Sequence, residues 1–155
     1  MRWKAIGVLG GMGPDATIEF FQRLIDRTRA PRDQDYPHVI IESNPQIPDR
    51  TSHILGDGES PLESLLATGN RLTGAGAELI AIPCNTSHYY IETLQEQLPV
   101  PIINMIEATA VRLNAIKPAV QRVGILATSG TVAADIFRAP LEPIEILYPS
   151  DDEQE

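Results

Sequence analysis

The sequence predicts an α/β fold, in which a mostly parallel sheet is flanked by helices on both faces. Short apolar runs typical of buried strands alternate with amphipathic helical patterns, and this alternation is typical of strand–helix–strand units. The 155 residues are enough for one such domain with a real core. With 43% hydrophobic and 21% charged residues the composition is that of a globular protein, so disorder is not indicated.

Boundary signals accompany these elements in order along the chain. Pro14 suits the first position of the first helix. Ser60, with Glu63 three residues later, predicts a capping box at the start of the second helix. Pro83 ends the third strand. The expected strands cover residues 5–9, 38–43, 78–83, 101–104, 122–128 and 144–149, and the expected helices cover 13–30, 60–77, 86–98, 105–116 and 129–139.

The pattern indicates a first α/β domain over residues 1–116 and an incomplete second α/β unit over residues 117–155. The segment 114–121 (NAIKPAVQ) is the expected joint, because the strand–turn–helix–strand pattern restarts after it. The sequence then stops in acidic residues, with no helix expected behind the last strand. Such an unfinished unit is expected to leave apolar strand residues exposed and to self-associate. The candidates are Val123, Ile125, Ile144 and Ile146.

Charge and cysteine content exclude several classes of protein. The formal net charge of −9 argues against a nucleic-acid or anionic-membrane surface. One cysteine leaves no internal disulfide, which suits a reducing cytosol. The N-terminal apolar run is too short for a signal peptide, and no stretch approaches the length of a membrane span. The chain is therefore expected in the cytoplasm.

Small and polar residues follow the strands, at the edge where open α/β sheets bind ligands. Gly10 to Gly13 follow the first strand, Asn44 to Arg50 the second, and Cys84 to Thr86 the third. Asn104 follows the fourth strand, and Thr128 to Thr131 follow the fifth. These segments supply glycine backbone, amides, hydroxyls, one thiol and one guanidinium. That inventory predicts a site for a small, polar, anionic ligand.

Cys84 lies between the end of a strand and the start of a helix, where the helix dipole and free N–H groups favour a thiolate. The alternative, a buried structural cysteine, is the usual case for a lone thiol. The change to polar residues at Cys84 itself, directly after Pro83, favours a catalytic acid/base. His88 is expected one turn further on the same face, with a solvated histidine of the first turn as the stronger alternative.

Three neighbouring features also have two interpretations. Residues 11–16 fit G-x-G-x-x-A, a weak dinucleotide fingerprint, but Glu42 lies about thirty residues on, further than a ribose-binding acid should. A tight turn that offers N–H groups to a small anion is favoured instead. Arg50 is either a ligand-binding cation or a surface residue on a long polar loop. The segment 128–131 is either a contact loop opposite Cys84 or only a helix cap.

Five segments of the sequence together form a specific pattern. They are IGVLGGMGPDAT (6–17), IPDRT (47–51), GAELIAIPCNTSH (76–88), VPIINMIEAT (100–109) and VGILATSGT (123–131). The pattern resembles the aspartate/glutamate racemase family, and most closely its aspartate racemase branch. The resemblance implies two α/β domains with a cleft between them and racemisation of aspartate or glutamate without pyridoxal phosphate or metal. It also implies two cysteines, one from each domain, that act as acid and base on opposite faces of the substrate Cα.

The resemblance also assigns residue roles. Cys84 matches the acid/base of the first domain, and Gln46 and Arg50 match the loop that reads the side-chain carboxylate. The residues expected to bind the substrate are Met12, Gln46, Arg50, Asn85, Thr86, Thr128, Ser129 and Thr131. The partner is therefore a small amino acid, and the family commonly forms homodimers.

The chain departs from the family pattern in its second unit. The Gly-Cys-Thr-Glu type motif that carries the second cysteine is missing, and the segment 138–146 is short. The chain, a fragment or a natural truncation, is therefore expected to be a racemase with impaired activity. Three alternatives stay open: a single-thiol decarboxylase or isomerase of the same superfamily, a non-catalytic carboxylate-binding or amino-acid-binding relic, and a Rossmann-type nucleotide binder.

Overall fold

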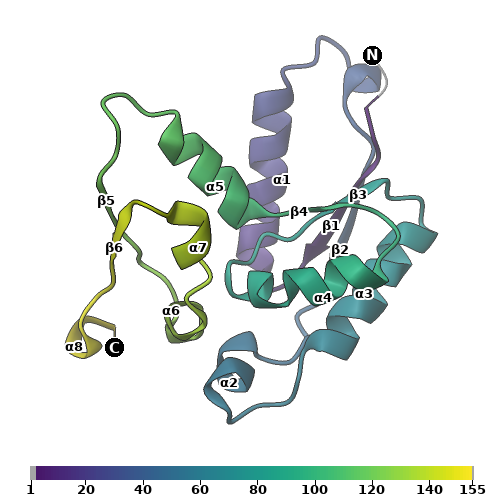
Figure 1. Ribbon diagram of the computed structural model, residues 1–155. Helices are drawn as coiled ribbons and strands as arrows, with labels where there is room; N and C mark the ends of the chain where they lie inside the picture. Colours follow the sequence, from purple (N-terminus) through teal and green to yellow (C-terminus); the bar gives the residue numbers. More distant parts are fainter. Residues whose placement is uncertain (1–2, 155) are drawn as a thin grey trace.

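Four parallel strands form the main sheet of the computed structural model, which describes residues 3–154 (Figure 1). Ile6 pairs with Val39 on one side and with Leu79 on the other, so β1 lies inside the sheet. The strands are β1 (Ile6–Gly10), β2 (Val39–Ser43), β3 (Leu79–Ala81) and β4 (Ile102–Ile103), in the spatial order β2-β1-β3-β4. Because all pairings are parallel, the carboxyl ends of the four strands meet along one edge.

Helices cover both faces of this sheet, which confirms the predicted α/β class (Figure 1). Ile40, Ile80 and Ile102 face the side of α3 and α4, where they join the main hydrophobic core. Side chains alternate along each strand, and Val39 on the opposite face lies beside residues of α1. These elements are α1 (Pro14–Thr28), α3 (Leu62–Gly74), the 3-10 helix η2 (Thr86–Tyr90) and α4 (Ile91–Gln97), and a 3-10 turn, η1 (Asp33–Asp35), precedes β2.

A second, two-stranded parallel sheet has its own core. Ile106 and Ala110 of α5 are buried with Phe137 and Leu141 against this sheet. Its strands are β5 (Arg122–Gly124) and β6 (Glu145–Leu147), and the surrounding helices are α5 (Met105–Asn114), α6 (Ser129–Ala134), α7 (Arg138–Leu141) and α8 (Asp151–Gln154). The helix α5 thus precedes residue 116 in the chain but packs with the second sheet. The division into domains at residues 1–116 and 117–155 stays a prediction.

Several elements differ from the sequence prediction. The loop around Arg50 contains a short helix, α2 (Arg50–Leu55), which Asp49 caps. The helix expected over 129–139 is interrupted at Asp135, whose left-handed backbone (φ 49°) separates α6 from α7. The helical turn α8 follows the last strand, where no helix was predicted. Helices of only four to six residues are too short to show the apolar periodicity on which the prediction depends.

The predicted capping box at Ser60 is wrong. The cap position of α3 falls on Pro61, which forms no side-chain hydrogen bond. Ser60 Oγ instead accepts from the backbone N–H of Leu62 at 3.3 Å. A serine one residue before the cap position therefore forms a local turn rather than the reciprocal bonds of a capping box.

The exposed apolar strand face was also assigned to the wrong residues. Val123, Ile125, Ile144 and Ile146 are half-buried and pack on the second core. The opposite face is the open one, because Leu147 of β6 is 43% exposed and Leu126, two residues beyond the end of β5, is 90% exposed. Among residues 3–154, no helix is long and apolar enough to cross a membrane.

Candidate active site

A cavity of about 450 Å³ opens beyond the carboxyl ends of β1 and β3 and reaches the start of α6. Four segments distant in sequence converge on it: the β1–α1 turn, the start of α2, the β3–η2 loop and the β5–α6 loop. Its lining residues are Met12, Gly13, Ala16, Asp49, Arg50, Thr51, Pro83, Cys84, Asn85, Thr86, Ala127, Thr128 and Thr131. The cavity thus contains every residue expected in the site except Gln46 and Ser129.

Cys84 is half-buried at the wall of this cavity, in a backbone held on both sides. Its N–H donates to the Ile82 carbonyl across Pro83 at 2.8 Å. Its own carbonyl lies 2.9 Å from His88 Nδ1. The helix that follows begins with the five-residue 3-10 segment η2 and not with α-helical turns, so the helix dipole expected to favour a Cys84 thiolate is weak here.

His88 is buried, with 4% of its surface exposed, so the expected solvated histidine is wrong. Besides the contact with the Cys84 carbonyl, its Nε2 accepts a hydrogen bond from the N–H of Met105 at 3.1 Å. Burial lowers the pKa of His88 below its ordinary value. The ring therefore lies behind Cys84 as a neutral group and does not line the cavity.

Three threonine hydroxyls form a closed triangle at the junction of the two sheets. Thr86 Oγ1 lies 2.8 Å from Thr131 Oγ1 and 3.0 Å from Thr128 Oγ1. Thr128 Oγ1 also lies 3.1 Å from Thr131 Oγ1 and accepts from the backbone N–H of Thr131 at 3.3 Å. Thr128 is thus the cap of α6, as one alternative of the sequence analysis had it, and also a cavity residue.

The start of α2 brings a cation and an anion to the cavity. Asp49 Oδ1 accepts from the Ser52 amide at 2.7 Å, and this hydrogen bond lowers the pKa of Asp49. Arg50 is half-buried, and its Nη1 donates to the carbonyls of Ile47 and Pro48 at 3.2 and 3.1 Å. Its Nε is buried and has no hydrogen-bond partner among residues 3–154. The guanidinium of Arg50 is the one positively charged group among the residues that line the cavity.

The glycine turn after β1 lets two loops approach closely. Gly11 has φ +94°, and a Cβ there would lie 2.4 Å from the backbone of Asn44. The Gly11 amide donates to Thr17 Oγ1 at 2.9 Å. This N–H is therefore used inside the turn, which weakens the expectation that the turn offers its amides to an anion.

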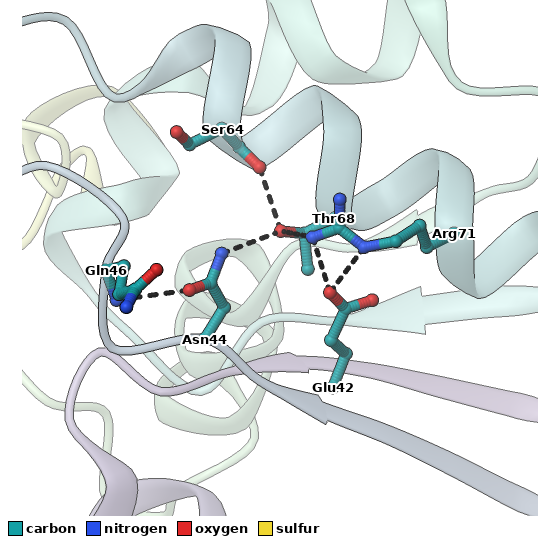
Figure 2. A network of polar contacts seen from close by, with 6 residues as sticks. All are labelled: Glu42, Asn44, Gln46, Ser64, Thr68 and Arg71. Carbon is teal, nitrogen blue, oxygen red and sulfur yellow. Dashed lines mark hydrogen bonds and ion pairs between the residues drawn. The ribbon is translucent and has the colours of Figure 1, made fainter.

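A polar network fixes the loop that connects β2 to α2 (Figure 2). Glu42 accepts from Arg71 Nε at 2.6 Å, and Arg71 Nη2 donates to Thr68 Oγ1 at 3.0 Å. Thr68 Oγ1 also accepts from the side-chain amide of Asn44 at 3.4 Å. Asn44 Oδ1 accepts from the backbone N–H of Gln46 at 3.1 Å. The network ends at Gln46, three residues before the cavity-lining Asp49, and it holds Glu42 in an ion pair with Arg71 of α3.

Gln46 is exposed and does not line the cavity, and Ser129 is likewise exposed outside it. Asp49 and Thr51 line the cavity as well, although Asp49 was expected only at the same edge of the sheet and neither was among the residues expected to bind substrate. The signal was present, because an aspartate three residues before a serine is a common start of a helix. A recognised α2 would have placed both residues at the cavity.

Comparisons with known proteins identify relatives of this chain. A family model described as Asp/Glu/Hydantoin racemase matches residues 9–154. A broad specificity amino-acid racemase of Bacillus subtilis (strain 168) is 32% identical over 143 residues, which are 88% of this chain and 60% of the relative. The chain therefore spans about 60% of the length of that relative.

Solved structures of the same fold include two at 30% identity or more. The Picrophilus torridus aspartate racemase has a TM-score of 0.86 and 31% identity, over 97% of this chain and 64% of that protein. An aspartate racemase homologue from Pyrococcus horikoshii OT3 has a TM-score of 0.77 and 30% identity, over 99% of this chain and 67% of that protein. Since the family match takes in all four segments around the cavity, the chain belongs to the Asp/Glu/hydantoin racemase family.

Proposed function

We propose that the cavity holds an amino acid, and that Cys84 is its acid/base for proton transfer at Cα, without an organic cofactor. The observation that carries this proposal is the convergence of the thiol with amide, hydroxyl and guanidinium groups from four segments on one cavity. These are the groups that an amino acid with a carboxylate requires.

The proposed step moves one proton. The Cys84 thiolate takes the proton from Cα, so an S–H bond forms while the Cα–H bond breaks, and the electron pair passes into the adjacent α-carboxylate. Asn85 and the threonine triangle line the same cavity and are the groups proposed to hold that carboxylate as its charge grows. Return of a proton from the same thiol restores the original configuration. Inversion requires a second acid on the opposite face of Cα.

We further propose a dicarboxylic amino acid, aspartate or glutamate, as the substrate. The support is Arg50, which is the one positively charged residue that lines the cavity. A guanidinium binds a carboxylate through strong charge-assisted hydrogen bonds, so it suits a second carboxylate of the ligand. A monocarboxylic amino acid would offer Arg50 no side-chain carboxylate.

The cysteine count favours a second candidate for this chain by itself. With Cys84 as the only thiol, one face of Cα has no cysteine partner. The chain alone is then an impaired racemase, a one-base catalyst of decarboxylation or isomerisation type, or a protein that binds a carboxylate without turnover.

The single cysteine also suits a reducing compartment, and we place the protein in the cytoplasm.

Solvent deuterium incorporation at Cα of aspartate and glutamate, followed by NMR in D₂O, tests the proposal. Exchange by the wild-type chain and its loss in Cys84→Ala and Cys84→Ser are expected, with each variant shown to be folded. Exchange that persists in both variants contradicts the role of Cys84. Binding of the amino acids without exchange supports the non-catalytic alternative. Binding of NAD or ATP that is unaffected by Cys84→Ala supports a nucleotide site instead.

A further inference from the structure

We infer that His88 is a positioning residue for Cys84, and that its Nδ1–H holds the Cys84 carbonyl while its Nε2 accepts the first amide of α5. The inference rests on the proposed role of Cys84, and it concerns the orientation of the thiol rather than contact with substrate. His88 is the buried titratable group nearest in sequence to the thiol, and the proton-transfer step does not use it.

The two contacts determine which ring nitrogen carries the proton. A backbone N–H can only donate, so the Met105 amide 3.1 Å from Nε2 requires a lone pair there. The proton of the neutral ring is therefore on Nδ1, from which it is donated to the Cys84 carbonyl at 2.9 Å. With 4% of the residue exposed, water does not compete for either nitrogen. The imidazolium form would turn an N–H toward the Met105 N–H and break the second contact.

The His88 ring connects the β3–η2 loop, which carries Cys84, to the second core. Asn104 Oδ1 accepts from the amides of Ile106 and Glu107, and His88 accepts from that of Met105. His88 and Asn104 together thus satisfy the first turn of α5, whose buried face belongs to the second core. The backbone that carries the Cys84 side chain is thereby held relative to both sheets that meet at the cavity.

Two variants separate the two contacts. The amide of Asn reaches about as far as Nδ1, so His88→Asn keeps a donor for the Cys84 carbonyl and loses the contact with Met105. The longer His88→Gln puts its amide near the position of Nε2, where its oxygen can accept from Met105, and it loses the donor to Cys84. The matched control is His38→Gln, because His38 is exposed.

The measurement is the ratio of Cys84 alkylation rates with iodoacetamide and with its bulkier N-benzyl derivative, read by intact mass. Both reagents use the same chemistry, so the thiolate fraction cancels in the ratio, and the single cysteine makes the reading unambiguous. The wild-type chain, His38→Gln and His88→Asn are expected to discriminate strongly against the bulky reagent. In His88→Gln this discrimination should fall by about fivefold, the effect of losing one hydrogen bond.

Equal ratios in all folded variants, or a larger fall in His88→Asn than in His88→Gln, would overturn the inference. If His88→Gln does not fold, ¹⁵N NMR of the wild-type imidazole decides. The inference requires a neutral His88 ring with its proton on Nδ1 at pH 7.5. A proton on Nε2 or a charged ring contradicts the inference. Neither readout needs turnover, so absence of Cα exchange would refute the proposed function while leaving this test intact.

Discussion

Arg50 is the residue that sets the proposed substrate class. Arg50→Gln removes the charge and is expected to weaken binding of aspartate and glutamate by about tenfold or more, because a hydrogen bond to a charged group is worth about 1.5–3 kcal/mol. Alanine binding should hardly change. Isothermal titration calorimetry measures both affinities, and Arg23→Gln, on the exposed side of α1, is the matched control. A loss of equal size for alanine and aspartate would count against a side-chain role.

His88 predicts how stability depends on pH. Burial depresses the pKa of His88 in the folded chain below its unfolded value of about 6.5. Below that pH the unfolded chain takes up a proton that the folded chain does not bind, so stability falls as the pH falls toward the depressed pKa. Urea unfolding between pH 7.5 and 5 should therefore show a steeper loss for the wild-type chain than for His88→Asn. Parallel pH profiles would contradict the assignment.

The residues that line the cavity were predictable where strand ends determine their position. Cys84, Asn85 and Thr86 directly follow a strand, so the parallel sheet alone places them at its carboxyl edge. Gln46 and Ser129 lie in the expected segments but do not line the cavity. The direction in which a side chain points from a turn depends on local backbone angles, which a sequence pattern does not encode. His88 contacts Met105, seventeen residues later in the chain. The residues next to His88 therefore do not predict that its side chain is buried.

At the scale of elements, the contact of α6 with α2 closes one side of the cavity. A Cβ on Gly130 would lie 2.7 Å from both Cα and Oγ1 of Thr51. Gly130→Ala is therefore expected to cost about 1–3 kcal/mol of unfolding free energy by overpacking, and to weaken ligand binding. Gly124→Ala in β5 meets open space and should change stability by less than about 0.5 kcal/mol.

Urea unfolding followed by circular dichroism compares these two glycine variants. Similar stabilities for Gly130→Ala and Gly124→Ala would mean that α6 and α2 are not packed as closely as the structure has them. The comparison isolates steric contact, because neither glycine has a positive φ.

The long elements were predictable and the short ones were not. The apolar runs of β1 and β2 and the periodic helices α1 and α3 fell within a few residues of their predicted bounds. The four-residue α7 and the six-residue α2 depend on capping and on neighbours. The wrong face of the second sheet was predicted to be exposed. The sequence pattern shows which residues alternate between the two faces, but not which face α5 and α7 cover.

At the scale of the whole molecule, the open face of the second sheet predicts self-association. Leu147 of β6 and Leu126, two residues beyond β5, are exposed there, and exposed apolar surface along a strand edge or face is a common interface. We expect dimers or larger species, with a weaker tendency in Leu126→Ser. Sedimentation velocity across micromolar concentrations measures this, and a monomer at every concentration would contradict it.

The central claim is that this chain holds one thiol on one face of an amino-acid Cα. The most direct test starts from pure L-aspartate and pure D-aspartate in D₂O and determines the configuration of the deuterated product by chiral chromatography and mass spectrometry. We predict deuterium incorporation into one enantiomer with retention of configuration, lost in Cys84→Ala. A deuterated product of inverted configuration would contradict the claim, because it requires a second acid on the opposite face of Cα.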